Sequence, residues 1–91
     1  MFRLWAREFK DTRMIRDIVI EDGTVETRTH KIFNALEKVC HEFDLPVPIW
    51  LENNINSFKQ TSSTKFRADS FIEEIPFDYL EIKVIEEDSA F

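Results

Sequence analysis

The sequence predicts an α+β fold: an N-terminal β-hairpin, one main amphipathic helix, a short middle strand and helix, and a C-terminal strand in a mostly antiparallel sheet. Three patterns lead to this prediction. Apolar and polar residues alternate in residues 2–10 and 14–21, apolar residues recur every three or four positions from 29 to 43, and alternation returns in residues 78–87. Alternation is typical of strands with one buried face, and the longer spacing is typical of a helix.

The first two expected strands form a hairpin. Residues 2–10 alternate until Phe9, which breaks the parity and predicts a bulge near residues 7–8. Residues 14–21 are rich in β-branched side chains, which favour strands. The segment Asp11-Thr12-Arg13 between them suits a short turn, so the two strands are expected to pair antiparallel.

The main helix is expected from about residue 27 to residue 43. Thr24 or Thr27 can cap it, because a threonine hydroxyl accepts a hydrogen bond from a free backbone amide of the first turn. The helix should end near Asp44, since Pro46 disfavours a helical conformation of the residue before it. Its buried stripe is expected to comprise Ile32, Phe33, Leu36, Val39, Cys40 and Phe43.

Shorter elements are expected after this helix. Residues 48–51 resemble a short strand, and residues 52–60 a short helix with Ile55 and Phe58 facing the core. Further along, residues 65–68 are expected to form a short strand.

The C-terminal part of the chain contains the clearest strand. Asp69 or Ser70 is expected to cap one helical turn through residues 71–73. The last strand, residues 78–87, has the most regular alternation of the chain. A helix packed on one face of antiparallel strands explains why each strand is apolar on one side only.

The composition points to an ordered domain and excludes several kinds of active site. Nine Phe, two Trp and one Tyr accompany a single glycine, Gly23. Phosphate-binding loops and nucleophile turns are built on glycines, so neither is expected. The length suits a single domain, residues 1–91, with one core.

The same composition bears on location. Cys40 is the only cysteine, which excludes an intrachain disulfide and favours a cytoplasmic protein. Charges interrupt the first residues, so no signal peptide is expected. The longest apolar stretch, residues 47–51, is too short to span a bilayer, so no membrane partner is expected.

No catalytic residue, metal site or cofactor is expected. Cys40 adjoins His41, but neighbours on a helix point about 100° apart. Cys40 also lies in the apolar stripe, where a thiol acts as a small hydrophobe. His30 and His41 lie eleven residues apart on one helix, about 16 Å, which is too far to share a metal.

Charge is distributed unevenly along the chain. The net charge is −6, and residues 73–88 carry seven acids and one base, whereas the rest of the chain holds eleven of each. Near the N-terminus, Arg3, Arg7 and Arg16 cluster around Trp5 and form the candidate interaction surface. Arginines around an aromatic ring on a sheet can bind single-stranded nucleic acid.

Internal pairing is the preferred interpretation of these arginines. If the first and last strands are neighbours, Arg3 and Arg7 face Glu81 and Glu86. Such cross-strand pairs contribute about 0.2–1 kcal/mol each. Nucleic acid is therefore disfavoured as a partner.

Three segments together resemble a known family: RLWAREFKD, ETRTHKIFNALEKVCHEFDLPVPIWL and TKFRADSFIEEIPFDYLEIKVIEED. They are similar to a family of short, uncharacterised proteins from anaerobic Gram-positive bacteria, and the similarity covers nearly the whole chain. The resemblance implies a stand-alone cytoplasmic bacterial protein. It implies no activity, cofactor or catalytic residue.

These observations favour a non-catalytic protein-interaction or small regulatory module that binds an unidentified protein partner. The acidic end and the basic hairpin would also pair between copies, which gives a homodimer as one option. The alternative is a nucleic-acid-associated protein that uses the basic N-terminal hairpin. A small enzyme with a carboxylate-lined pocket ranks third.

Overall fold

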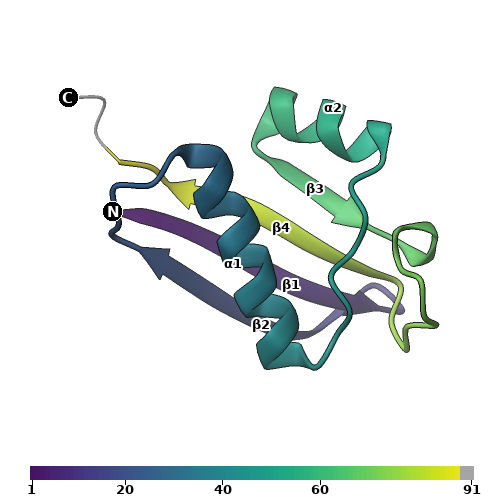
Figure 1. Cartoon of the computed structure of the whole chain (residues 1–91). Helices are drawn as coiled ribbons and strands as arrows, with labels where there is room; N and C mark the ends of the chain where they lie inside the picture. The colour runs from purple at the N-terminus through teal and green to yellow at the C-terminus, as the bar shows by residue number, and fades with distance from the viewer. Residues whose placement is uncertain (89–91) are drawn as a thin grey trace.

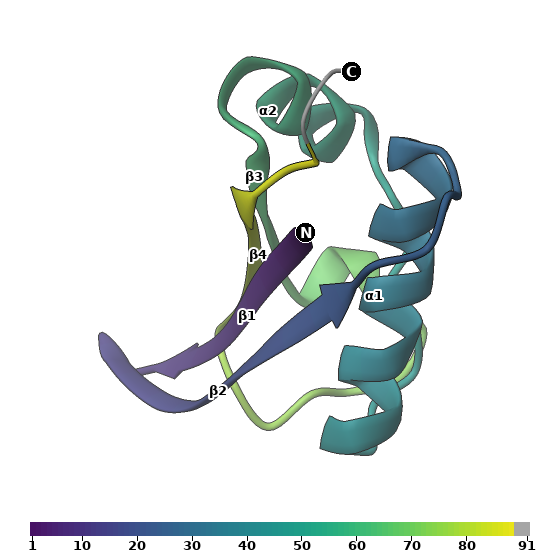
Figure 2. The same ribbon diagram turned by 90° about the vertical axis from the view of Figure 1, so that its left-hand side faces the viewer.

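The computed structural model describes residues 1–88 and shows a four-stranded antiparallel sheet with two helices on one of its faces (Figures 1 and 2). The strand order is β2-β1-β4-β3. The elements are β1 (Phe2–Lys10), β2 (Arg13–Asp22), α1 (Arg28–Phe43), α2 (Glu52–Thr61), β3 (Ser63–Phe66), the 3₁₀ turn η1 (Ala68–Ser70) and β4 (Tyr79–Glu86). The predicted α+β class is confirmed. We call the sheet face that the helices leave uncovered the open face.

The N-terminal hairpin forms as the alternation predicts. Lys10 pairs with Arg13, so Asp11 and Thr12 form a two-residue turn, and both have positive φ angles, 52° and 64°. Positive φ at both central residues matches the right-handed twist of the flanking strands. The bulge falls between Glu8 and Phe9, one residue beyond the predicted position.

Helix α1 supplies one side of the core. The Thr27 hydroxyl accepts a hydrogen bond from the His30 backbone amide, and Asp44 ends the helix in a left-handed conformation. Thr27 is therefore the cap, rather than Thr24. Most of the predicted stripe is buried, but Phe33 is 45% exposed. The stripe packs against apolar side chains of β1 and β4, among them Leu4, Ala6, Leu80 and Ile82.

A buried asparagine holds α2 to β3. Asn54 is 1% exposed, and its side-chain amide donates to the Thr64 hydroxyl and to the Lys65 carbonyl, each at 2.9 Å. Its side-chain oxygen accepts the Leu51 backbone amide at 3.0 Å. Because its donors and its acceptor all find partners, Asn54 fixes α2 against the sheet edge at little desolvation cost.

The predictions for the middle of the chain were wrong in part. Residues 48–51 form no strand: Pro46 and Pro48 carry no backbone N–H, and the Ile49 amide donates to the Ser70 carbonyl rather than to a strand. Ile55 is 42% exposed, although Phe58 is buried as expected.

Two boundaries near the C-terminal half also differ. The short strand spans Ser63–Phe66 instead of residues 65–68, and the helical turn is η1, which starts at Ala68 and ends before Phe71. Each shift is two or three residues, because short elements carry little periodicity to fix their ends.

Candidate protein interface

Three of the four residues predicted to form an interaction surface lie together, and the fourth does not. Arg3, Trp5 and Arg7 project from β1 onto the open face, because their neighbours Phe2, Leu4 and Ala6 are buried under the helices. Arg16 pairs across the hairpin with Glu8, on the helix-covered face. The basic cluster of the sequence is therefore divided between the two faces of the sheet.

The arginines of the open face are paired with carboxylates of neighbouring strands. Strands β1 and β4 are adjacent, which is the arrangement under which Arg3 and Arg7 were expected to face Glu81 and Glu86. Arg7 bonds Glu81 at 2.5 Å, and Arg3 lies 2.9 Å from Glu21 and 3.3 Å from Glu86. These pairs neutralise much of the positive charge that the sequence places in the hairpin.

Trp5 is held in this network. Its indole N–H donates to Asp17 at 2.9 Å, and the Arg7 guanidinium lies 4.1 Å from the centre of its ring. Both contacts orient the ring on the open face.

The buried pair of Glu8 and Arg16 closes the core near the end of α1. Glu8 is 1% exposed and accepts two hydrogen bonds from Arg16, at 2.8 and 2.9 Å. Arg16 also donates to the Phe43 carbonyl at 2.9 Å, and its guanidinium lies over the Phe43 ring at 4.2 Å. The hydrogen bonds to Glu8 raise the pKa of Arg16. Arg16 therefore stabilises the fold and is not a residue of the open face.

The cysteine and histidine side chains considered as a nucleophile or as metal ligands lie in surroundings that suit a structural role. Cys40 is 1% exposed, and burial raises the pKa of its thiol to about 11, with smaller contributions from Glu37 and Glu8. His30 lies 3.1 Å from Glu26 on the exposed side of α1. Among residues 1–88, no three His, Cys, Asp or Glu side chains are placed to hold a metal ion.

Strand β2 forms an uncovered edge of the sheet. It is ten residues long and pairs only with β1 among the described strands. Several of its apolar side chains are exposed: Met14 (48%), Ile15 (51%) and Val19 (43%). A long apolar edge presents unpaired backbone groups that another strand can bind.

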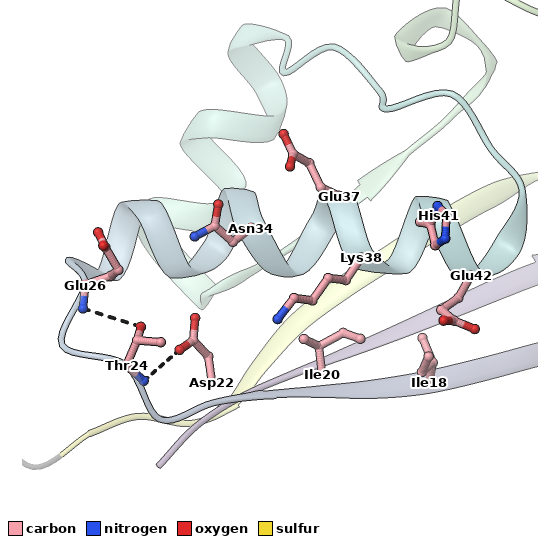
Figure 3. Close-up of a pocket in the computed structure, with 10 residues that line it drawn as sticks. All are labelled: Ile18, Ile20, Asp22, Thr24, Glu26, Asn34, Glu37, Lys38, His41 and Glu42. Carbon is pink, nitrogen blue, oxygen red and sulfur yellow. Dashed lines mark hydrogen bonds between the residues drawn. The ribbon is translucent and has the colours of Figure 1, made fainter.

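A hollow of about 760 Å³ lies between this edge and α1 (Figure 3). Ile18 and Ile20 of β2 form its strand side, and Lys38 extends from α1 toward the strand. Asp22, Thr24 and Glu26 lie at the end where the chain enters the helix, and His41 and Glu42 lie at the other end. We call this hollow the β2 groove.

The β2 groove is acidic. Four carboxylates line it against one lysine, so its formal charge is −3 with a neutral histidine; the carboxylates are Asp22, Glu26, Glu37 and Glu42. Hydrogen bonds from the hydroxyl and backbone amide of Thr24 lower the pKa of Asp22. Glu37 and Glu42 make no ion pair with any residue of the described part. Glu42 points toward the strand side of the β2 groove and Glu37 points away from it (Figure 3), so Glu42 is available to a cationic ligand there.

Sequence patterns did not reveal the β2 groove. Its carboxylates come from β2, the loop that follows and the outer face of α1, and they share no local spacing. One feature of the sequence did point to this region. In residues 14–21 both the odd-numbered and the even-numbered positions include apolar side chains, whereas a strand with a single buried face needs them at only one of the two sets.

Comparisons with known proteins add no assignment. No known protein family, curated protein or solved structure matches this chain. The resemblance to proteins of anaerobic Gram-positive bacteria therefore stays a prediction. Within residues 1–88, no helix is both long and apolar enough to cross a membrane.

Proposed function

We propose that this protein is a non-catalytic protein-interaction module that binds an extended segment of a partner along β2. The observation that supports this most directly is the combination of an uncovered ten-residue edge strand with a groove beside it. In strand addition, backbone hydrogen bonds supply affinity and alternate side chains enter pockets that supply specificity. Here the alternate side chains of the partner would enter the β2 groove.

The lining of the β2 groove defines the chemistry of the partner. Ile18 and Ile20 favour apolar side chains, and the unpaired carboxylate of Glu42 favours lysine or arginine (Figure 3). Because only alternate side chains of an added strand enter the groove, that set would combine apolar and basic residues. A second copy of this chain fits less well, because pairing two β2 edges with both helix layers on the same side brings two acidic grooves together.

Selection from a random library of 12-residue peptides on the folded protein tests the proposal. The enriched peptides should carry both apolar and basic residues within one set of alternate positions, and they should protect backbone amides of β2 from hydrogen exchange. Glu42→Lys reverses one groove charge at the C-terminal end of α1, where a lysine suits the helix dipole, and should weaken these peptides about tenfold. Glu73→Lys makes the same charge change at an exposed position outside the groove and should leave binding unchanged.

Two outcomes contradict the proposal. The first is a set of enriched peptides that protects another element and leaves β2 unprotected. The second is equal binding by wild type, Glu42→Lys and Glu73→Lys. Either would mean that the β2 groove is not the binding site.

The nucleic-acid alternative has one observation in its favour. The Tyr79 ring stacks on Phe9 at 5.0 Å, and the cationic groups of Lys65 and Arg67 lie 4.9 and 5.2 Å from its centre. Stacked rings beside cations are typical of single-strand binding surfaces. The carboxylates paired with Arg3 and Arg7 count against it, so this alternative ranks second.

The enzyme alternative ranks third. The β2 groove does contain four carboxylates, but they are spread along the length of α1 and the preceding loop (Figure 3). Hydrogen bonds from Thr24 lower the pKa of Asp22, which suits a turn-stabilising carboxylate rather than a proton donor at neutral pH.

A further inference from the structure

A second apolar recess lies on the other flank of α1, between α1 and α2, and it is separate from the β2 groove. Trp50 is one of its lining residues and makes edge-on contacts with Phe33 at 5.9 Å and with Phe58 at 5.5 Å. Ile32 and Ile55 complete the apolar lining. We call this recess the α1–α2 pocket.

The apolar side chains around the pocket are more exposed than packing against the protein requires. Phe33 is 45% exposed and Ile55 is 42% exposed, although both lie next to buried residues of the core. Exposed aliphatic and aromatic side chains that converge on one recess mark an interaction site more often than isolated ones do.

The volume of the pocket indicates the size of what it receives. It measures about 250 Å³. Sites for whole small molecules measure about 300–1,000 Å³. The α1–α2 pocket therefore suits one or two anchoring side chains of a larger partner, as in the docking of an amphipathic helix between two helices.

The charge of the pocket lining indicates the sign of the charge on the partner. Arg28 and Lys59 belong to the lining, which contains no carboxylate, whereas three other hollows of the described part each include at least one. Lys59 makes no ion pair with residues 1–88. The lining of the pocket is therefore cationic, although the net charge of the chain is −6. Nearby charges act most strongly on a bound partner, because salt screens interactions beyond about 8 Å.

Arg28 is shared between this pocket and the C-terminal strand end. Its guanidinium lies 2.6 Å from Glu87 and donates to the Ser62 hydroxyl at 3.0 Å. A carboxylate of a partner would compete with Glu87 for Arg28. The occupancy of the pocket is therefore linked to an internal ion pair that can be changed by mutation.

The geometry points to a binding site for an acidic amphipathic helix of a partner protein in the α1–α2 pocket. That helix has apolar side chains at positions i, i+3 and i+7, of which one or two enter the pocket against Trp50 and Ile55, and its flanking carboxylates pair with Lys59 and Arg28. This interaction does not depend on strand addition at β2, so the two sites are testable separately.

Trp50 provides the measurement. In a Trp5→Phe background Trp50 is the only tryptophan, and its fluorescence reports on the pocket. The probes are two 16-residue alanine-based helical peptides with leucines at the same three positions, one carrying glutamates and the other lysines beside the leucines. The glutamate peptide should shift Trp50 emission with a Kd below about 100 µM, and the lysine peptide should bind at least about tenfold more weakly.

Three variants test the assignment of residues. Lys59→Glu should weaken the glutamate peptide at least about fivefold, and Glu87→Gln should strengthen it, because Arg28 is then free to pair. Ile55→Asp should abolish binding, and its side chain is exposed enough for the protein to remain folded. Far-ultraviolet circular dichroism of each variant verifies the fold.

The inference is overturned if the lysine peptide binds as well as the glutamate peptide, if Lys59→Glu and Ile55→Asp have no effect, or if the glutamate peptide fails to bind at about 1 mM. It is also overturned if Trp50 emission changes with protein concentration alone and Ile55→Asp removes that change. The occupant would then be a second copy of this chain.

Discussion

The ion pair between the buried Glu8 and the partly exposed Arg16 predicts an asymmetry between two single substitutions. The Glu8 side chain is 2% exposed, whereas that of Arg16 is 44% exposed. When Glu8 loses its charge, Arg16 can turn toward water. When Arg16 is removed, the carboxylate of Glu8 stays inside the protein without a partner. Replacing Arg16 should therefore cost more stability than replacing Glu8.

The contacts give the size of this difference. Arg16→Met retains part of the apolar stem but removes both hydrogen bonds to Glu8, the bond to the Phe43 carbonyl and the contact with the Phe43 ring. Because Arg16 is 44% exposed, the pair is only partly buried, and the cost of leaving Glu8 without its partner should be about 2–3 kcal/mol, below the range for fully buried pairs. Glu8→Gln retains a hydrogen-bond acceptor, so its cost should be about 1–1.5 kcal/mol.

Urea unfolding at neutral pH, followed by circular dichroism, measures both free energies. The half-exposed arginine of the open face is the matched control: Arg3→Met should cost less than about 1 kcal/mol. Equal costs for Arg16→Met and Glu8→Gln would refute the reasoning.

Three further predictions concern the core, the thiol and nucleic acid. Leu36→Ala should cost about 2–5 kcal/mol in denaturant titration, and a loss below about 1 kcal/mol would contradict its place in the core. Because burial raises the pKa of Cys40 to about 11, the thiol should react slowly with a thiol reagent in native buffer. The raised pKa of Cys40 contributes to the free energy of unfolding below about pH 8.5, and this contribution is lost as the pH rises toward the pKa of the folded protein. Cys40→Ala should remove that part of the pH dependence of stability. Labelled single-stranded RNA and DNA should not bind at about 1 µM in near-physiological salt; tight binding that Arg7→Glu abolishes would favour the nucleic-acid alternative.

Local patterns were sufficient for the hairpin and for α1. The alternation of residues 2–10 predicted a strand, and β1 spans Phe2–Lys10 because its even positions are buried under the helices. The spacing of residues 29–43 predicted α1 for the same reason, since one stripe of the helix faces the sheet. In both elements the spacing of the apolar residues along the sequence matches the face that is buried in the fold.

Arg16 shows where the local pattern was insufficient. Its closeness in sequence to the other arginines placed it in the candidate surface. The register shift at the bulge instead pairs it with Glu8 on the helix-covered face. A shift of one residue moves every later side chain of a strand to the opposite face. The face of the sheet on which each β2 side chain lies therefore depended on the bulge and not on composition.

The location of free negative charge in the folded chain differs from its location in the sequence. The sequence concentrates its acidic excess in residues 73–88, yet the fold places Glu81, Glu86 and Glu87 beside Arg7, Arg3 and Arg28. Asp88 bonds the buried ammonium group of Lys31, and this bond lowers the pKa of Asp88. Carboxylates of α1, which the linear pattern did not distinguish, are left without ion pairs beside the β2 edge. If a cationic partner binds at the β2 groove as proposed, Glu42→Lys should weaken it, whereas Glu73→Lys, in the acidic C-terminal segment, should not; the opposite result would place the partner on that segment.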